Sequence, residues 1–113
     1  MHGVPGRYIS RFSIRDDKTL IFMVFRDEYL GGEFPSDLAG RKSALTEAFA
    51  GLDWECPQIL SALADVQTVY FDSVSQIRMD TWTKGRTTLV GDAAACPSLI
   101  SGEGAGLAMA EAY

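Results

Sequence analysis

The last part of the sequence, "TTLVGDAAACPSLISGEGAGLAMAEAY" (residues 87–113), contains the residues best suited to chemistry. An apolar stretch leads into Gly91 and Asp92, and a loop separates them from Gly102, Gly104 and an Ala-rich helix. Open α/β sheets bind ligands at the carboxyl ends of their strands. A carboxylate placed there can accept hydrogen bonds from sugar or polyol hydroxyls. Glycines before a helix leave its first N–H groups facing a ligand, and the helix dipole there favours negative charge. The combination predicts a cofactor site, although the Gly-Asp dipeptide alone also fits a simple turn cap.

The spacing of the glycines excludes two common nucleotide motifs. No Gly-Lys-Ser/Thr follows, so the loop is not a phosphate-binding P-loop. "GEGAGL" gives G-x-G-x-G rather than the dinucleotide spacing G-x-G-x-x-G, and no acidic residue follows about twenty positions later. A sugar- or phosphate-binding fold that uses the same helix start stays open as a weaker alternative.

Short strands and helices must position this motif. Residues 7–28 predict a hairpin whose second strand, Leu20 to Phe25, is apolar throughout and expected to be covered on both faces. Residues 30–40 predict a loop, and residues 41–64 predict two short helices, with Pro57 as a first helical residue of the second. In the first strand the alternation puts four residues on one half-buried face: Tyr8, Ser10, Phe12 and Ile14.

The second half of the chain predicts two further strands and a short helix. Residues 66–79 are rich in β-branched and aromatic residues, with a bulge or bend expected near Asp72. Residues 86–91 predict the strand that delivers the terminal motif, and the last helix is expected to begin near Gly104. The expected fold is α/β (α+β), an antiparallel-rich mixed sheet with two to three short helices, in a single domain over residues 1–113.

Composition excludes several classes of protein. A net charge of -5 over 113 residues argues against nucleic acid as a partner, which needs a basic face. No apolar run approaches the ~20 residues of a membrane helix, and the N-terminal residues lack a signal peptide's apolar core. Cys56 and Cys96 have no metal-type spacing, so we expect two free thiols, no metal site and a cytoplasmic protein.

Residues outside the motif offer little chemistry. His2, the only histidine, lies near the N-terminus, where a His-based triad is not expected. The acidic pairs at 16–17 and 27–28 fit a solvated surface, and the arginines of the first strand fit an exposed face more often than an acidic-ligand pocket. Further pocket candidates, among which the spacing does not choose, are Tyr70, Gln76 and Arg78.

The terminal segment "GRTTLVGDAAACPSLISGEGAGLAMAEAY" (residues 85–113) resembles the second flavin-binding motif of the FAD-dependent aromatic hydroxylases, the para-hydroxybenzoate hydroxylase-like monooxygenases. That motif is an apolar strand, G-D-A-A-H, a Pro-containing loop, G-Q-G and a helix ending in D-A. Residues 1–80 resemble the substrate-domain section of the family, and residues 85–113 its flavin-contacting motif with a truncated helix. The sequence departs from the pattern at five places: Ala95 for His, Ser98-Leu99 where proline is frequent (Pro97 is adjacent), Glu103 for Gln, Gly106 for Asn, and Glu111 for Asp.

The resemblance implies FAD as cofactor and a role for each matching residue. Asp92 would hydrogen-bond the ribityl chain of FAD, in a turn shaped by Gly91 and Ala93. After Gly102, the N–H groups of Gly104 and Ala105 would face the N1–C2=O edge of the flavin. The full enzyme would use NAD(P)H and O2 to hydroxylate an aromatic or polyketide-like small molecule; no catalytic residue is assigned.

Two family segments do not occur in this sequence: the Rossmann-type G-x-G-x-x-G unit that holds the ADP half of FAD, and a D-G motif. We therefore expect a fragment of a larger enzyme that alone is inactive and binds FAD weakly or not at all. The alternative is a non-catalytic α/β module that self-associates, or completes a site with a partner chain, through apolar surface. In either case, the surface left by the missing domain could join copies of the chain into a homo-oligomer.

Overall fold

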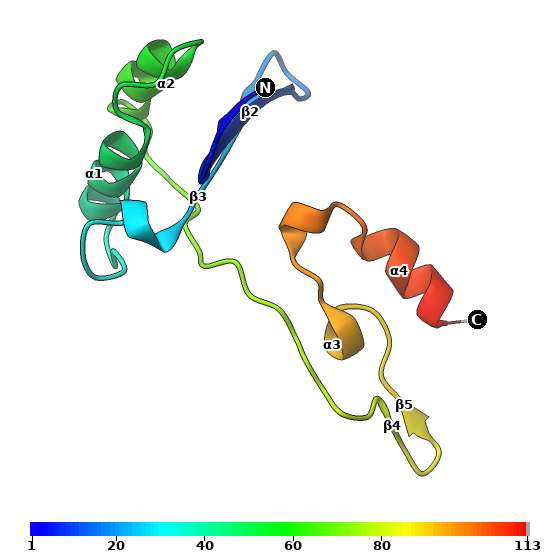
Figure 1. Cartoon of the computed structure of the whole chain (residues 1–113). Helices are drawn as coiled ribbons and strands as arrows, with labels where there is room; N and C mark the ends of the chain where they lie inside the picture. Colours follow the sequence, from blue (N-terminus) through cyan, green and yellow to red (C-terminus); the bar gives the residue numbers. More distant parts are fainter. Residues whose placement is uncertain (113) are drawn as a thin grey trace. The chain divides into compact units, whose positions relative to one another are not determined.

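The computed structural model describes residues 1–112, with all side chains except that of Leu99, and divides the chain into two compact units. The N-terminal unit is Met1–Phe71 and the C-terminal unit is Asp72–Tyr113. Figure 1 shows the elements of each. The sequence suggested a single domain with a substrate-domain-like part at residues 1–80 and a flavin-contacting part at residues 85–113. The boundary between the two observed units, after Phe71, lies earlier in the chain.

The N-terminal unit is built on a three-stranded antiparallel sheet in the order β1-β2-β3. Its strands are β1 (His2–Val4), β2 (Arg7–Ser13) and β3 (Thr19–Phe25). β2 and β3 form the predicted hairpin, with Arg7 opposite Phe25 and Ser13 opposite Thr19. Asp16 and Asp17 have φ of 61° and 52°, a left-handed turn conformation that aspartate tolerates better than most residues. The short strand β1 was not predicted.

The predicted half-buried face of β2 is only partly confirmed. Ser10 is buried as predicted, but Ile9 on the opposite face is fully buried, whereas Tyr8 and Phe12 are 37% and 50% exposed. The odd-numbered face carries the core residue because the helices pack on that side, where Arg7 and Arg11 reach past the core to polar partners. β3 is also less covered than expected, since Leu20 is 52% exposed.

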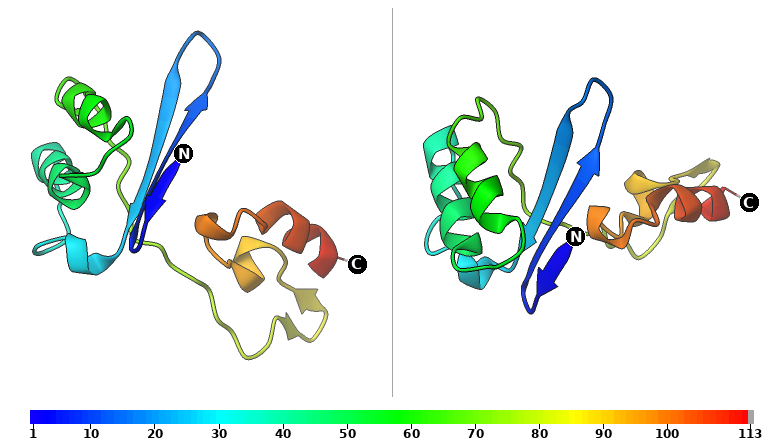
Figure 2. Two further views of the ribbon diagram at one scale, coloured as in Figure 1. Left: turned by 45° about the horizontal axis from the view of Figure 1, so that its top comes forward. Right: turned by 90° about the horizontal axis from the view of Figure 1, so that it is seen from above.

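Two α-helices pack on one face of this sheet, as both views in Figure 2 show. Helix α1 (Leu38–Phe49) begins three residues before the predicted 41, and the Asp37 side chain caps it by accepting a hydrogen bond from Gly40 N–H at 2.8 Å. Helix α2 (Cys56–Leu63) has Pro57 in its first turn, as predicted. A single 3-10 turn, η1 (Asp27–Tyr29), links β3 to the loop before α1.

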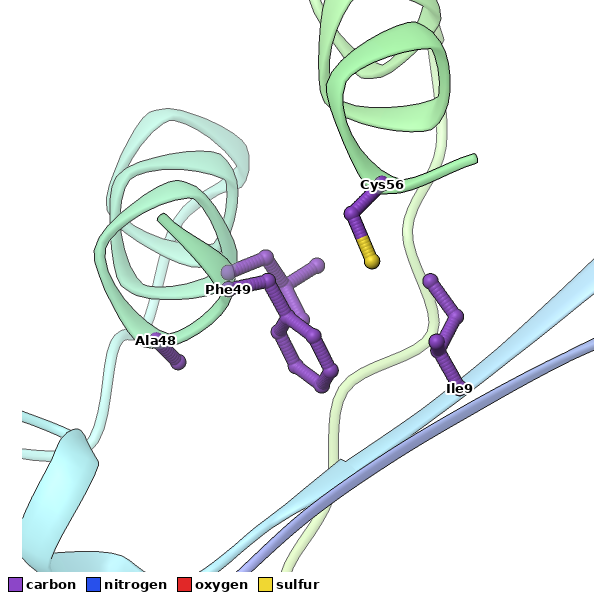
Figure 3. Packing of buried hydrophobic residues seen from close by; sticks show 5 residues of the cluster. Ile9, Ala48, Phe49 and Cys56 are labelled. Atoms are coloured by element: carbon purple, nitrogen blue, oxygen red, sulfur yellow. The ribbon is translucent and has the colours of Figure 1, made fainter. Parts of the chain in front are cut away.

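The core of the N-terminal unit lies between these helices and the sheet. Ile9 from β2, Phe49 from α1 and Cys56 from α2 point toward one another and are fully buried (Figure 3). The Phe25 ring packs edge-on against the Phe49 ring, with centroids 6.0 Å apart. This core is the main source of stability in the unit, because burying each large apolar side chain contributes about 1.5–3 kcal/mol.

The strand predicted over residues 66–79 is wrong: no strand forms among the described residues 64–82. Strand-type residues are not sufficient, because β-structure depends on a neighbouring strand to accept its hydrogen bonds. The segment is instead held at its start by α1, where Arg41 donates to the carbonyl of Val69 at 3.2 Å and Lys42 to that of Ala64 at 2.6 Å.

The C-terminal unit consists of short elements around a loop. They are β4 (Thr83–Lys84), β5 (Thr87–Thr88), α3 (Asp92–Ala95), η2 (Leu99–Ser101) and α4 (Gly104–Glu111). The predicted strand at 86–91 is reduced to the two residues of β5, which pair with β4 across a turn in which Gly85 has φ of 62°. The two antiparallel sheets and the few short helices confirm the predicted mixed class.

Candidate functional site

The turn at Gly91 opens the candidate site. Gly91 has φ of 63° and ψ of -141°, a conformation close to that reserved for glycine. Its carbonyl accepts hydrogen bonds from Ala94 N–H and Ala95 N–H at 2.9 and 3.0 Å, which closes the single turn of α3. Asp92 and Ala93 at the start of this turn are exposed. The backbone of Gly91 therefore presents the Asp92 carboxylate at the surface.

Glu111 joins this turn to the last helix. Oε2 of Glu111, at the end of α4, accepts a hydrogen bond from Gly91 N–H at 2.7 Å. A Cβ placed on Gly91 would lie 3.4 Å from the Cβ of Ala108, so α4 packs closely on the turn. The two halves of the motif, about twenty residues apart in sequence, thus meet within one unit.

The sequence interpretation assigned no role to Glu111. The signal that could have found it is its place in the family pattern, where a carboxylate also stands near the end of the helix. A charge-assisted hydrogen bond from a backbone N–H is stronger than a neutral one, so the Glu111 carboxylate adds to the packing of α4 on this turn.

The first turn of α4 provides unpaired backbone donors. Its N-cap residue, Glu103, makes no side-chain capping hydrogen bond, and the first backbone bond described runs from Leu107 N–H to the Glu103 carbonyl at 2.9 Å. The N–H groups of Gly104, Ala105 and Gly106 therefore lack helical partners, as at every helix start. A Cβ built on Gly104 meets no atom within 4 Å, so the space beside this residue is open.

A carboxylate lies beside these donors. Oε2 of Glu103 would be 3.7 Å from a Cβ placed on Gly106. The negative charge of Glu103 therefore stands near the positive end of the helix dipole, where an anionic ligand group would otherwise be favoured.

Serine hydroxyls shape the loop between α3 and α4. Ser98 has φ of 89°, and its carbonyl accepts a hydrogen bond from the Ser101 hydroxyl at 2.9 Å. Ser101 Oγ in turn accepts from Glu103 N–H at 3.3 Å. Cys96 ties the loop to the preceding segment, because its carbonyl accepts a hydrogen bond from Ile77 N–H at 3.2 Å. Gly102, with φ of 68°, then redirects the chain into α4.

The remaining candidate residues have other partners. Arg7 donates to the Ala48 carbonyl at 3.0 Å and lies over the Tyr29 ring, and Arg11 forms an ion pair with Glu55 at 2.8 Å. Both arginines are thus engaged on the helix side of the sheet. In the C-terminal unit Arg78 donates to the Gln76 side chain at 3.0 Å, and in the N-terminal unit His2 stacks on Trp54.

The two cysteines are free and differ in environment. Cys56 is fully buried, and burial raises the pKa of its thiol, with nearby Arg7 lowering it and Asp53 raising it further. Cys96 is half-buried in the loop before α4. Among residues 1–112 no three His, Cys, Asp or Glu side chains gather closely enough to hold a metal ion. No helix described in this chain has the length and apolar character to cross a membrane.

Comparisons with known proteins find related sequences and structures. The chain is 40% identical over 90 residues to a flavin-dependent monooxygenase of Legionella longbeachae serogroup 1, covering 80% of this chain and 23% of that protein. It is 34% identical over 80 residues to an FAD-dependent monooxygenase of Sarocladium schorii, covering 71% of this chain and 19% of that protein. The crystal structure of tetracycline destructase Tet(55) matches with a TM-score of 0.68 and 36% identity, over 92% of this chain and 28% of that one. No family model matches the sequence.

The chain has the fold of a flavoprotein segment. It consists of an antiparallel sheet with covering helices, followed by a Gly-Asp turn that packs on a Gly-x-Gly helix. The chain is homologous to a segment of the flavin-dependent monooxygenases, which confirms the predicted family. It spans about a quarter of the length of the curated relatives that it matches.

Proposed function

We propose that this chain contributes the ribityl and isoalloxazine side of an FAD site in a monooxygenase. The observation that carries the proposal is the 2.7 Å hydrogen bond from Gly91 N–H to Glu111, which packs the Gly-Asp turn against α4. This bond unites in one unit an exposed carboxylate and an uncapped helix start. Both features suit a ligand that carries polyol hydroxyls at one end and an electron-rich ring edge at the other.

The residues present fit such a ligand. Asp92 would accept hydrogen bonds from ribityl hydroxyls, with Gly91 and Ala93 holding its turn. The open space at Gly104 admits a planar ring close to the backbone, where the N–H groups of Gly104 and Ala105 would donate to acceptor atoms on the ring edge.

Bound FAD would supply the redox chemistry, with NAD(P)H as reductant and O2 as the source of oxygen. The protein's own part is to orient the ring and to offer donors where negative charge develops. Relatives named flavin- or FAD-dependent monooxygenases support the reaction class. A structural relative named a tetracycline destructase makes a polycyclic, polyketide-like substrate the most specific candidate, within the wider class of aromatic small molecules.

We expect the 113-residue chain alone to bind FAD weakly and to turn over no substrate, because it has no G-x-G-x-x-G segment for the ADP half. The test must therefore detect weak binding. We suggest titrating FAD into the 15N-labelled chain and following the backbone amide resonances. The expected result is a saturable shift of the amides around Asp92, Gly104 and Ala105, with the amides of the N-terminal unit unchanged.

Two variants with opposite expected effects sharpen this test. Asp92→Ala removes the ribityl acceptor and should weaken binding. Glu103→Gln removes a negative charge beside the helix start and should strengthen it. FAD shifts that persist at full amplitude in Asp92→Ala, or that appear only in the N-terminal unit, would refute the assigned site.

Riboflavin and ADP distinguish this proposal from the phosphate-binding alternative. Riboflavin carries the ring and the ribityl chain without phosphate, so it should shift the same amides as FAD. If ADP reproduces the FAD shifts and riboflavin does not, the helix start binds phosphate and the flavin assignment is wrong.

A further inference from the structure

Strand β3 lies at an edge of the N-terminal sheet. It pairs with β2 on one side, and no strand in the described part of the chain pairs with it on the other. Its sequence, "TLIFMVF", contains no charged residue and no proline over seven residues. Natural edge strands are usually protected by charges, prolines or bulges, because a bare edge is a template for another strand.

The register shows which backbone groups of β3 point outward. The ladder continues beyond both strand ends, where Arg26 N–H donates to Gly6 O and Ile14 N–H donates to Lys18 O, each at 2.9 Å. These bonds join even-numbered residues, and opposite pairs alternate between bonded and non-bonded along an antiparallel ladder. The even residues of β3 therefore bond to β2, whereas the N–H and C=O groups of Ile21, Met23 and Phe25 are directed to the outer edge.

The side chains of β3 leave apolar surface on the face away from the helices. Leu20 is 52% exposed, and its cross-strand neighbour Phe12 is 50% exposed. On the same face, the Tyr8 and Phe22 rings pack edge-on with centroids 6.5 Å apart. A strand added beside β3 would extend this apolar face and cover Leu20.

We propose that the outer edge of β3 pairs antiparallel with β3 of a second copy of this chain. A two-fold axis at Phe22 would place all seven residues of each strand in the ladder, with Ile21 opposite Met23 of the partner copy. The outward N–H and C=O groups of Ile21 and Met23 would then exchange hydrogen bonds across the dimer. Because the strand is uncharged, an identical strand meets no like charge within the paired stretch, and a two-fold contact closes at two copies.

The flanking charges predict how the dimer responds to salt. In this register Lys18 of one copy lies opposite Arg26 of the other, and each copy carries a net charge of -5. Both effects are repulsive between exposed groups and are screened by salt. Dimerisation should therefore strengthen as ionic strength rises, whereas contact between oppositely charged patches would weaken.

Sedimentation of the full chain over a range of concentrations tests the proposal, with two matched variants. Leu20→Lys places a charge at the pairing edge, and Phe12→Lys places the same charge directly across the ladder, on the same face but on the inner strand. We expect the wild type and Phe12→Lys to dimerise and Leu20→Lys to remain monomeric. A wild type that is monomeric at all concentrations would overturn the proposal. So would equal loss in both variants, which indicates stacking of apolar faces, or growth beyond two copies.

Amide hydrogen exchange gives a second, residue-level test. The amides of Leu20, Phe22 and Val24 should be protected at every concentration because they bond to β2. The amides of Ile21 and Met23 should become protected only where the chain is dimeric. Thr19→Pro, at the exposed first residue of β3, removes an outward donor without removing a bond to β2 or a core side chain, so it should keep the far-ultraviolet circular dichroism of the wild type and weaken the dimer. Protection of the odd-numbered amides that does not depend on concentration would contradict pairing between copies.

Discussion

The two units of this chain are stabilised in different ways. In the N-terminal unit Ile9, Phe49 and Cys56 are fully buried between a sheet and two helices. In the described part of the C-terminal unit only Ala94 is buried, and apolar side chains such as Val74 and Met109 are 58% and 71% exposed. The candidate site lies in the second unit, where glycine conformations and polar hydrogen bonds hold the chain in place of a core.

The N-terminal unit therefore supplies a stable core, whereas the C-terminal unit positions the residues of the candidate site. A turn held by single hydrogen bonds opens locally at lower free energy than a helix packed on a sheet. The N-terminal unit should therefore unfold cooperatively, while the motif around Gly91 and Gly104 exchanges its amides more readily. The effects of substitutions in the two units should therefore be measurable separately.

The largest effect is expected from Phe49→Ala. This change removes a fully buried ring from the centre of the N-terminal core, and such substitutions cost about 3–5 kcal/mol. Urea unfolding monitored by Trp54 fluorescence, in a Trp82→Phe background, reports on this unit alone. Phe34→Ala is the control, because Phe34 is 50% exposed and its loss should cost far less. Equal losses in the two variants would show that the core is not centred on Phe49.

The next effect tests the bond that holds the candidate site together. Glu111→Ala removes the acceptor of Gly91 N–H, and a hydrogen bond to a charged group is worth about 1.5–3 kcal/mol. Because Glu111 is only half-buried, we expect the lower part of that range. The measurement is amide exchange at Gly91, which should become faster, with the Trp54 unfolding curve unchanged.

Glu111→Gln serves as the matched control. The glutamine side chain keeps an acceptor oxygen without the charge, so it should retain part of the protection at Gly91. If Glu111→Ala leaves exchange at Gly91 unaltered, the turn is held by packing on Ala108 rather than by the carboxylate.

The same contrast explains how much the sequence could predict. The hairpin, the two α-helices and the start of the last helix at Gly104 follow from local signals: turn residues, helical spacing, Pro57 and paired glycines. These signals act over a few residues, so they do not depend on the rest of the fold. The family resemblance likewise rests on a contiguous motif, and the comparisons confirm it.

The errors lie where structure depends on neighbours distant in the sequence. Tyr8 and Phe12 alternate as a core face should, yet the helices pack on the other side, where Ile9 lies between two arginines. Residues 66–79 have the composition of a strand but pair with no strand in the described chain. Glu111 was missed for the same reason, because its partner Gly91 lies twenty residues away. The roles assigned to Asp92 and Gly104 stay predictions.

A smaller effect concerns the helix starts of the two units. Helix α1 is capped by the Asp37 side chain, whereas α4 has no side-chain cap. Asp37→Ala should lower the stability of the N-terminal unit by about 1 kcal/mol, measured by urea unfolding, and Asp37→Asn should restore most of it. If Asp37→Asn is as damaging as Asp37→Ala, the loss comes from the charge at the helix dipole rather than from the hydrogen bond to Gly40.

The smallest effect near neutral pH comes from the buried thiol of Cys56. Burial raises the pKa of Cys56 above its ordinary value, so the folded unit favours the protonated thiol more strongly than the unfolded chain does. This stabilisation is fully present below the pKa of the unfolded thiol, about 8.5, and is lost as pH rises through the pKa of the folded one. Urea unfolding of the wild type should therefore show stability that falls above about pH 8.5. Cys56→Ala should flatten that fall, and Cys96→Ala, which alters the half-buried thiol of the other unit, should not. A Cys56→Ala variant that loses stability as steeply as the wild type would show that other groups cause the alkaline loss. The flattening, if seen in unfolding of the N-terminal unit alone, would tie the pH response to its core and not to the candidate site.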